Sequence, residues 1–340
     1  MRQLSKPSTA QCNCSLYTLF LMAEPKYISC VRLSEILEEV SHDSVNRFLL
    51  RECYTPEDLF NEVKADLTLT GGTLSVDDTV EDKPYRDIEK SAFVGYFWSG
   101  KHKRTVKGIN LITLYYTDLS GRSYPINYRI YDKHEGKTKN DYFREMMLEV
   151  KHWGISPAWV TGDSWYSSLE NLKFLRNEEV SFLFGIADNR NVSLERGTLI
   201  PVKRLEIPES GLVAYLKEFG WVKVFCQWFR NEPRYYIMYQ PNVERVKELT
   251  RIDFKQVHDT HWQIECFHRV IKQVCNIERF YVRNEQAIRN HFYCALRAFS
   301  KLQNLFLRGV IRNCYEISRD LFIPVIRQFI ADHATEATFA

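Results

Sequence analysis

A chain of 340 residues with 45% hydrophobic and 14% aromatic side chains can bury a sizeable core, which excludes an intrinsically disordered protein. Its formal charge of +3 neither requires nor excludes nucleic acid, so local clusters must decide. The nine cysteines are scattered and odd in number, which favours reduced thiols in the cytoplasm. The apolar run 16–22 is too short to span a bilayer, so we predict a core helix there and no membrane partner.

Residues 1–69 are predicted to be helical. The pattern predicts helices over 33–40 and 41–50, and a third that begins after Thr55 with Pro56 in its first turn and ends near residue 66. The break between the first two has the length of a helix-turn-helix connection, and the second helix offers polar side chains to DNA: Ser44, Asn46, Arg47 and Arg51. Small helical bundles share this pattern, so plain packing is the alternative interpretation.

The stretch 73–79 is predicted to be a strand that ends in Asp77 and Asp78. Because successive side chains of a strand alternate between faces, one carboxylate lies on the side of Ser75 and the other on the side of Leu74 and Val76. We therefore expect only one of the two in a functional site. A capped turn after a strand is the alternative interpretation.

The following segments predict alternating strands and helices. Strands are expected over 108–116 and 123–131, joined by a hairpin at 117–122, and a helix over 139–153 that Gly154 ends. A buried strand over 158–162 comes next, and Asp163 lies just past its carboxyl end, where α/β sheets commonly carry functional groups. A helix over 169–176 and a strand over 180–184 complete a mixed five-stranded sheet.

A β-rich insertion at about 186–240 precedes a helix over 261–273 that carries Glu265. One stripe of this helix is apolar, and its neighbour holds His261, Glu265, Arg269 and Lys272. A carboxylate there can hold a divalent cation, and Arg269 and Lys272 a phosphodiester. An ordinary amphipathic helix with solvated charges is the alternative. Trp262 is interpreted first as a core anchor, and second as a ring that stacks on an unpaired base.

Two further segments complete the pattern. A long helix is expected over 284–307, and a helical tail over 311–340. The basic cluster Lys101, Lys103, Arg104 and Lys107 fits a contact with the DNA backbone as well as it fits a solvated loop.

Three acids occur in order on these elements, namely Asp77, Asp163 and Glu265. Carboxylates that converge on one sheet edge repel each other unless cations lie between them. That arrangement is typical of a two-metal site for phosphoryl transfer, in which the protein mainly positions groups and neutralises charge.

The order of elements resembles the RNase H-like core, and the acids resemble the Asp, Asp, Glu triad of bacterial insertion-sequence DDE transposases. More narrowly, the chain resembles the group with a β-rich insertion and a Tyr-x2-Arg-x3-Glu-x6-Lys signature, because Glu265 and Lys272 have that spacing. The first motif, Asp-x-Thr, matches residues 77–79 and favours Asp77, and Asp163 matches the second. The Arg and Tyr positions hold His261 and His258, which can still donate to phosphate, and this departure leaves the second-strand chemistry open.

The resemblance implies an α/β fold with three parts: a DNA-binding segment (1–69), an RNase H-like catalytic domain (70–310) and a helical tail (311–340). It implies that Asp77 bridges two Mg²⁺ ions, with Mn²⁺ as a substitute, and that Asp163 and Glu265 each complete one oxygen shell. The expected DNA contacts are Lys272, Arg269, His261 and His258 on the helix of Glu265, Arg47 in the helix-turn-helix-like segment, and Lys103 and Arg104 in the basic cluster.

The implied activity is metal-dependent cleavage at element ends and transfer of the 3′-hydroxyl strand into target DNA. The implied partners are double-stranded DNA, both inverted-repeat ends and target, and a second copy of the chain in a synaptic complex on the bacterial nucleoid. Two alternatives share the pattern: a metal-dependent nuclease on the same fold, and an inactive DNA-binding regulator.

Overall fold

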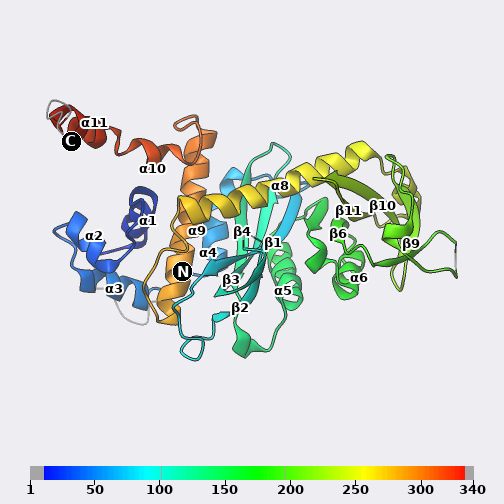
Figure 1. Cartoon of the computed structure of the whole chain (residues 1–340), viewed down its shortest axis with the longest axis horizontal. Helices are drawn as coiled ribbons and strands as arrows, with labels where there is room; N and C mark the ends of the chain where they lie inside the picture. Colours follow the sequence, from blue (N-terminus) through cyan, green and yellow to red (C-terminus); the bar gives the residue numbers. More distant parts are fainter. Residues whose placement is uncertain (1–10, 101, 196, 334–340) are drawn as a thin grey trace, which may run out of the picture. The chain divides into compact units, whose positions relative to one another are not determined.

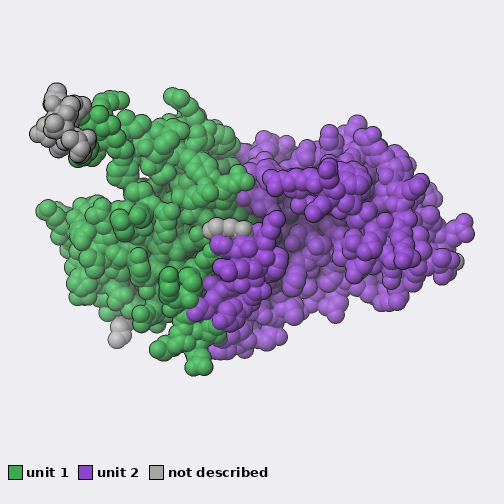
Figure 2. Space-filling view, viewed as in Figure 1, with its two compact units in different colours: residues 1–55, 81–91, 267–340 green, residues 56–80, 92–266 purple. Residues whose placement is uncertain are grey.

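The computed structural model describes residues 11–100, 102–195 and 197–333. The chain forms two compact units, each assembled from separate segments (Figure 2). Unit 1 comprises residues 1–55, 81–91 and 267–340, and unit 2 comprises residues 56–80 and 92–266. The predicted division at 69/70 and 310/311 concerns function and stays a prediction.

Unit 2 is built around a mixed sheet, in which the described residues form eleven strands (Figure 1). Five of them form a core in the order β4-β3-β1-β5-β6, in which β5 pairs in parallel with β1 and β6. The core strands are β1 (Thr73–Asp82), β3 (Arg104–Thr117), β4 (Ser123–Ile130), β5 (Trp159–Gly162) and β6 (Ser181–Ile186). The predicted mixed five-stranded α/β core is therefore confirmed.

Two features of this core differ from the prediction. β1 does not end at the two carboxylates, because it continues to Asp82 after its pairing with β5 stops at Val76. The strand β2 (Val94–Ser99) was not predicted, and it pairs with the first half of β3 as a hairpin.

The predicted insertion consists of β7 (Asn191–Ser193), β8 (Ile200–Pro201), η4 (Val202–Arg204), β9 (Leu212–Leu216), β10 (Gly220–Phe229) and β11 (Glu232–Tyr239). These strands do not form a sheet of their own, because β11 pairs antiparallel with β6 and so extends the core sheet. The β-rich character of 186–240 is confirmed.

Side-chain alternation gives the sheet two different faces. Phe182 and Phe184 of β6 join the large core with residues of α4 (Pro56–Val63), α5 (Lys139–His152) and α6 (Leu169–Asn177), so we call this the α5 face. Leu183 points to the opposite face and packs against Phe254 and Val257 of α8 (Arg251–Gln273), which we call the α8 face.

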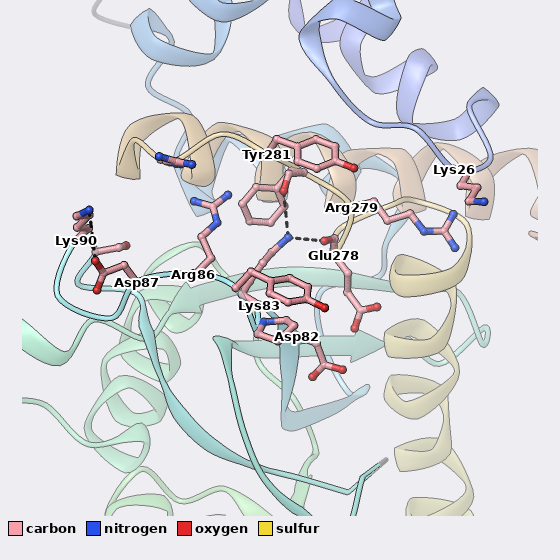
Figure 3. Close-up of a pocket in the computed structure, with 14 residues that line it drawn as sticks. Lys26, Asp82, Lys83, Arg86, Asp87, Lys90, Glu278, Arg279 and Tyr281 are labelled. Atoms are coloured by element: carbon pink, nitrogen blue, oxygen red, sulfur yellow. Dashed lines mark hydrogen bonds and ion pairs between the residues drawn. The ribbon is translucent and has the colours of Figure 1, made fainter.

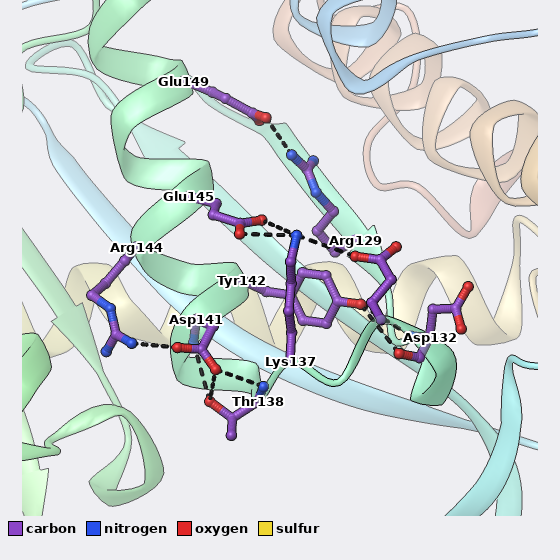
Figure 4. Close-up of polar contacts among 10 residues, drawn as sticks. Arg129, Asp132, Lys137, Thr138, Asp141, Tyr142, Arg144, Glu145 and Glu149 are labelled. Atoms are coloured by element: carbon purple, nitrogen blue, oxygen red, sulfur yellow. Dashed lines mark hydrogen bonds and ion pairs between the residues drawn. The ribbon is translucent and has the colours of Figure 1, made fainter.

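The chain enters α5 through a capping box. The Thr138 hydroxyl accepts from the Asp141 backbone N–H, and the Asp141 carboxylate accepts from the Thr138 N–H (Figure 4). Arg129 of β4 pairs with Glu149 of α5, which ties the helix to the sheet. The helix ends at His152 with Trp153 as its C-cap, and Gly154 follows with φ +93°, so the predicted stop is confirmed.

The remaining short elements of unit 2 are η1 (Lys64–Asp66), η2 (Lys133–Glu135), η3 (Ser164–Tyr166) and α7 (Val243–Glu248). The predicted helix from Thr55 to about residue 66 is present as α4 followed by η1.

Unit 1 is helical, and α1 and α3 pack against its longest helix, α9 (Glu285–Leu307), whose N-cap is Asn284. Its other helices are α1 (Cys14–Ala23), α2 (Cys30–Ile36), α3 (His42–Arg51), α10 (Glu316–Asp320) and α11 (Ile323–His333). Buried polar side chains of α9 fix its neighbours: the Tyr17 hydroxyl of α1 bonds His291 Nδ1 at 3.0 Å, and Asn290 donates to the Leu49 carbonyl of α3 at 2.7 Å.

The helices of unit 1 confirm the predicted core helix over 16–22, the helix over 41–50, which is α3 with Ser41 as its N-cap, and the helical tail as far as residue 333. Residues 334–340 lie outside the described part. The first of the two predicted DNA-segment helices begins and ends earlier than expected, at Cys30 and Ile36. In the described part of the chain, no helix is both long and apolar enough to cross a membrane.

Candidate active site

The two faces of the sheet separate Asp77 from Asp78. Leu74 and Val76 lie in the core on the α5 face, so Asp78 points to that face and Asp77 to the α8 face. The carboxylate of Asp78 accepts from Lys139 Nζ (2.6 Å), Asn110 Nδ2 (2.6 Å) and the Tyr166 hydroxyl (3.1 Å). Asp78 is therefore fully engaged in structural hydrogen bonds, which leaves Asp77 as the carboxylate on the face of α8.

Asp163 lies beside Asp77 on the neighbouring strand. Val76 and Gly162 are the last register pair between β1 and β5, and each is followed directly by an aspartate. Asp163 also points to the α8 face, since Val160 lies in the core of the α5 face. Its Oδ1 accepts from the Trp165 N–H at 2.9 Å, so the start of η3 fixes the side chain.

Burial and neighbouring carboxylates disfavour the charged form of both aspartates. Loss of solvation, followed by the negative charge of Asp78, raises the pKa of Asp77 to about 7. Asp163 has an exposed surface, but many protein atoms surround its carboxylate. This partial desolvation, followed by the charges of Asp77 and Asp78, raises its pKa to about 7 as well. A cation between Asp77 and Asp163 would relieve this repulsion.

A row of residues across the strands leads from Asp163 to α8. Gly185 of β6 packs against the Asp163 backbone, because a Cβ there would lie 3.5 Å from the Asp163 carbonyl carbon. Gly185 pairs in register with Tyr236 of β11, whose hydroxyl lies 3.3 Å from His258 Nε2 of α8. Phe254, one turn earlier on α8, stacks on Phe225 of β10 with ring centroids 4.8 Å apart.

This anchoring brings Glu265 toward the aspartates. From His258 to Glu265 the helix advances about 10 Å, and from β11 to β5 the sheet also spans about 10 Å. Figure 1 shows α8 running from β10 and β11 across β6 toward β1. Asp163, Glu265, His258 and His261 accordingly line one cavity of about 800 Å³.

The cavity also carries aromatic and basic residues that the sequence pattern did not identify. They are Trp228 and Phe229 at the end of β10, Arg234 and Tyr236 of β11, and Lys255 of α8. The guanidinium of Arg234 lies over the Phe229 ring at 4.4 Å. The only signal in the sequence was the aromatic run at the β10–β11 turn, which alternation alone does not assign to a site.

Trp262 is not a core anchor. Its side chain is 56% exposed and lines this cavity, so the first interpretation of the residue was wrong. The core contacts of α8 are made instead by Phe254, Val257 and Ile264, which occupy its buried stripe.

The other predicted DNA contacts lie elsewhere. Arg269 is exposed, and Lys272 Nζ lies 3.3 Å from Glu278 and 3.8 Å from the fully buried Glu81, so Lys272 faces two carboxylates in unit 1. Arg47 of α3 is half-buried. Ser44, one turn earlier, is buried, and its hydroxyl accepts a hydrogen bond from the Cys12 N–H. Ser44 is therefore not available to DNA.

The basic cluster occupies the turn between β2 and β3. Lys103 and Arg104 are exposed there, where Arg104 pairs with Ser99, and Lys101 lies outside the described residues. A role in DNA binding stays a prediction for each of these cations.

Among the residues that the structure describes, no three His, Cys, Asp or Glu side chains lie close enough to hold a metal ion together. What the site offers is a close pair of carboxylates, Asp77 and Asp163, with Glu265 on the cavity that Asp163 lines. Hard oxygen donors with raised pKa values suit a divalent cation such as Mg²⁺.

Comparisons with known proteins agree with this architecture. A family model described as "Transposase DDE domain" matches residues 73–300. The chain is similar in structure to a piggyBac transposase solved by cryo-EM as a synaptic complex with hairpin DNA, with a TM-score of 0.55 and 12% identity, over 96% of this chain and 72% of that one. Among curated proteins none matches. The predicted RNase H-like fold is confirmed.

Proposed function

The chain belongs to the family of transposases with a DDE domain, and we propose that it cleaves DNA at the ends of an insertion sequence and transfers the freed 3′-hydroxyl strand into target DNA. Membership of this family means a role in DNA transposition, by phosphoryl transfer with divalent metal ions. The observation that carries the finer proposal is the placement of Asp77, Asp163 and Glu265 toward one face of the sheet, with the last two on one cavity.

In the proposed site, Asp77, Asp163 and Glu265 hold two Mg²⁺ ions, for which Mn²⁺ substitutes in vitro. Such ions supply activation of the attacking oxygen and stabilisation of the leaving oxygen. Asp77 suits the shared position because it lies next to Asp163 and is less exposed. The raised pKa values of Asp77 and Asp163 support this role, since both carboxylates favour a nearby cation.

The remaining cavity residues suit a DNA strand. His258, His261 and Lys255 can donate to phosphate oxygens, and the exposed ring of Trp262 can stack on an unpaired base. We further propose phosphate contacts by Arg269, Arg47, Lys103 and Arg104. For Lys272 we propose that DNA replaces at least one of its two carboxylate partners, Glu81 and Glu278.

Two element ends must be joined in one reaction, so we propose a homodimer in a synaptic complex acting on the bacterial nucleoid. The similar piggyBac transposase was solved in a synaptic complex with hairpin DNA, which supports double-stranded DNA as the partner of this chain. The three predicted parts, 1–69, 70–310 and 311–340, keep their proposed roles as DNA-binding segment, catalytic domain and tail.

The experiment that separates the candidate functions uses a labelled duplex that carries the terminal repeats, a target plasmid, and Mg²⁺ or EDTA. Cleavage at the repeat ends with products joined to the plasmid supports the transposase. Cleavage without joining supports a nuclease on the same fold. Repeat binding without cleavage, equal for the wild type and an Asp163→Asn variant, supports an inactive DNA-binding regulator.

A further inference from the structure

Unit 1 contains a second cavity, whose lining residues take no part in the proposed catalytic site. It has a volume of about 660 Å³, within the usual range for a ligand site. Its walls are residues 82–91, which begin at the last residue of β1, and residues 278–283, which lie between α8 and α9, together with Lys26 (Figure 3).

Two cations fasten these segments to each other. Lys83 Nζ donates to the backbone carbonyls of Glu278 (2.5 Å) and Phe280 (3.3 Å) and lies 3.5 Å above the Phe280 ring. Arg86 donates to the Val282 carbonyl and also approaches the Phe280 ring, at 5.3 Å. Specific hydrogen bonds therefore hold the two segments of the cavity wall together.

Positive charge is in excess on this wall. Six of its fourteen residues are basic and three are acidic. The basic residues are Lys26, Lys83, Arg86, Lys90, Arg279 and Arg283. In Figure 3 the labelled ones follow one another across the cavity, from Lys90 through Arg86 and Lys83 to Arg279 and Lys26.

The three acids of the wall, Asp82, Asp87 and Glu278, offset this charge only in part, since they face six cations. The carboxylate of Glu278 lies 3.3 Å from Lys272, outside the cavity, and Asp87 lies 3.5 Å from Lys90. Arg86 and Arg279 donate to backbone carbonyls, which satisfy hydrogen bonds but leave the charge in place.

Burial and mutual repulsion both disfavour the charged forms of Lys83 and Arg86. Burial, followed by the charge of Arg86, lowers the pKa of Lys83 to about 7. Burial, followed by the charge of Arg283, also lowers the pKa of Arg86. A bound anion would reverse both effects, as a cation would for clustered carboxylates.

Two tyrosine rings at the cavity complete the recognition chemistry. Tyr85 is fully exposed and Tyr281 is 72% exposed, although both line the cavity. Exposed rings beside a row of cations suit a single-stranded nucleic acid, in which the phosphates follow the cations and unpaired bases stack on the rings. A duplex keeps its bases stacked inside and cannot use the rings in this way.

We propose that this cavity binds a single DNA strand, with phosphates on Arg283, Arg279 and Lys26 and a base on Tyr281. The proposal goes beyond the proposed function and rests on it only for the polymer, DNA. It adds a second strand-binding site in unit 1 to the cavity of about 800 Å³ in unit 2.

The test is the anisotropy of a fluorescein-labelled dT 12-mer on the full chain in EDTA, over a range of salt concentrations. Arg283→Ala is expected to weaken binding about 5- to 20-fold and to lower the slope of log K against log salt by about 0.7, one phosphate contact. Tyr281→Ala is expected to weaken binding about 5- to 100-fold, whereas Tyr281→Phe keeps the ring and stays within about 2-fold of the wild type.

The matched control is Arg308→Ala, an exposed arginine of unit 1 that does not line the cavity. Binding by Arg283→Ala and Tyr281→Ala within about 2-fold of the wild type would overturn the proposal. So would equal competition by a glutamate 12-mer, because the cavity would then select charge alone. A second readout is cross-linking of a bromodeoxyuridine 12-mer: labelled peptides with Tyr281 or Tyr85 support the proposal, and labels only elsewhere contradict it.

Failure of this proposal is distinguishable from failure of the catalytic one. Binding of the 12-mer that depends on Arg283 and Tyr281, with no cleavage of repeat ends by the wild type, would remove only the catalytic proposal. If the wild type cleaves repeat ends, but the Arg283→Ala and Tyr281→Ala variants bind the 12-mer as the wild type does, only the proposed strand-binding site in unit 1 is contradicted.

Discussion

Asp77 and Asp163 are neighbours on two parallel strands, each one residue beyond the last register pair, Val76 and Gly162. A Cβ on Gly162 would lie 2.7 Å from Val76 Cγ1 and 2.8 Å from the Phe184 ring. The close approach of the strands at this point, which sets the two aspartates side by side, therefore depends on the absence of a side chain at residue 162.

A Gly162→Ala substitution tests this packing. We expect a loss of about 1–3 kcal/mol in the free energy of unfolding, because the new methyl group overlaps buried atoms on both sides. Gly100→Ala is the control, since no atom lies within 4 Å of a Cβ at residue 100, and we expect a change within about 0.5 kcal/mol. Urea denaturation measures both. Equal effects would show that strand packing at Gly162 is loose.

The pairing of Asp78 with Lys139 gives a second prediction. Their side chains are 13% and 16% exposed, so Lys139→Met leaves a nearly buried carboxylate without its counter-ion and is expected to cost about 3 kcal/mol of stability. Lys137 pairs with Glu145 at 2.9 Å, but with both side chains about 40% exposed (Figure 4), so Lys137→Met is expected to cost less than about 1 kcal/mol. Thermal and urea unfolding of the two variants would contradict this account if Lys137→Met were the more damaging.

His291 in the core of unit 1 predicts a dependence of stability on pH. Burial, followed by the charge of Lys83, lowers its pKa to about 3, while Tyr17 and Asn276 hydrogen-bond its two ring nitrogens. The unfolded chain binds the proton below about pH 6.5 and the folded chain does not, so this residue makes stability fall as pH decreases from about 6.5 to about 3.

The measurement is the free energy of unfolding of the wild type and His291→Gln across that pH window. In the variant, the slope of the free energy of unfolding against pH is expected to be smaller by up to about 1.4 kcal/mol per pH unit, which corresponds to one proton. His42→Gln, on the exposed surface of α3, is the control for the replacement of a histidine. An unchanged slope in His291→Gln would show that the imidazole is protonated in the folded chain.

The Sγ atoms of Cys14 on α1 and Cys294 on α9 lie 3.9 Å apart. The hydrogen bond from Cys294, followed by the charge of Arg297, lowers the pKa of Cys14 to about 6, although desolvation opposes it. Oxidised glutathione should therefore convert these two thiols to a disulfide, with two glutathione thiols released. Peptide mapping by mass spectrometry should find the Cys14–Cys294 link in the wild type and in Cys12→Ser, but not in Cys14→Ser. A link between other cysteines only would contradict the prediction.

Local patterns predicted most elements, because capping residues and side-chain periodicity are properties of neighbouring residues. The same alternation that separated Asp77 from Asp78 along one strand holds in the structure. The sequence did not predict that β1 runs on to Asp82, beyond its pairing with β5, nor that the insertion extends the core sheet through β11.

Contacts between distant segments account for the remaining differences. Trp262 is a large apolar residue of the kind often found in cores, but the buried stripe of α8 is formed by Phe254, Val257 and Ile264. Lys272 has the spacing of the family signature, yet the residues that it meets, Glu81 and Glu278, come from the end of β1 and the segment after α8. Neither pairing follows from helical periodicity.

The central claim is that Asp77, Asp163 and Glu265 form one catalytic site, and single-turnover cleavage of a repeat-end duplex in Mg²⁺ tests it most directly. Removing even an outer-shell group of a metal site typically costs 10- to 100-fold, so Asp77→Asn, Asp163→Asn and Glu265→Gln are each expected to cleave at least about 100-fold more slowly while binding the duplex normally. A rate within about 3-fold of the wild type in any one of these folded variants would contradict the claim.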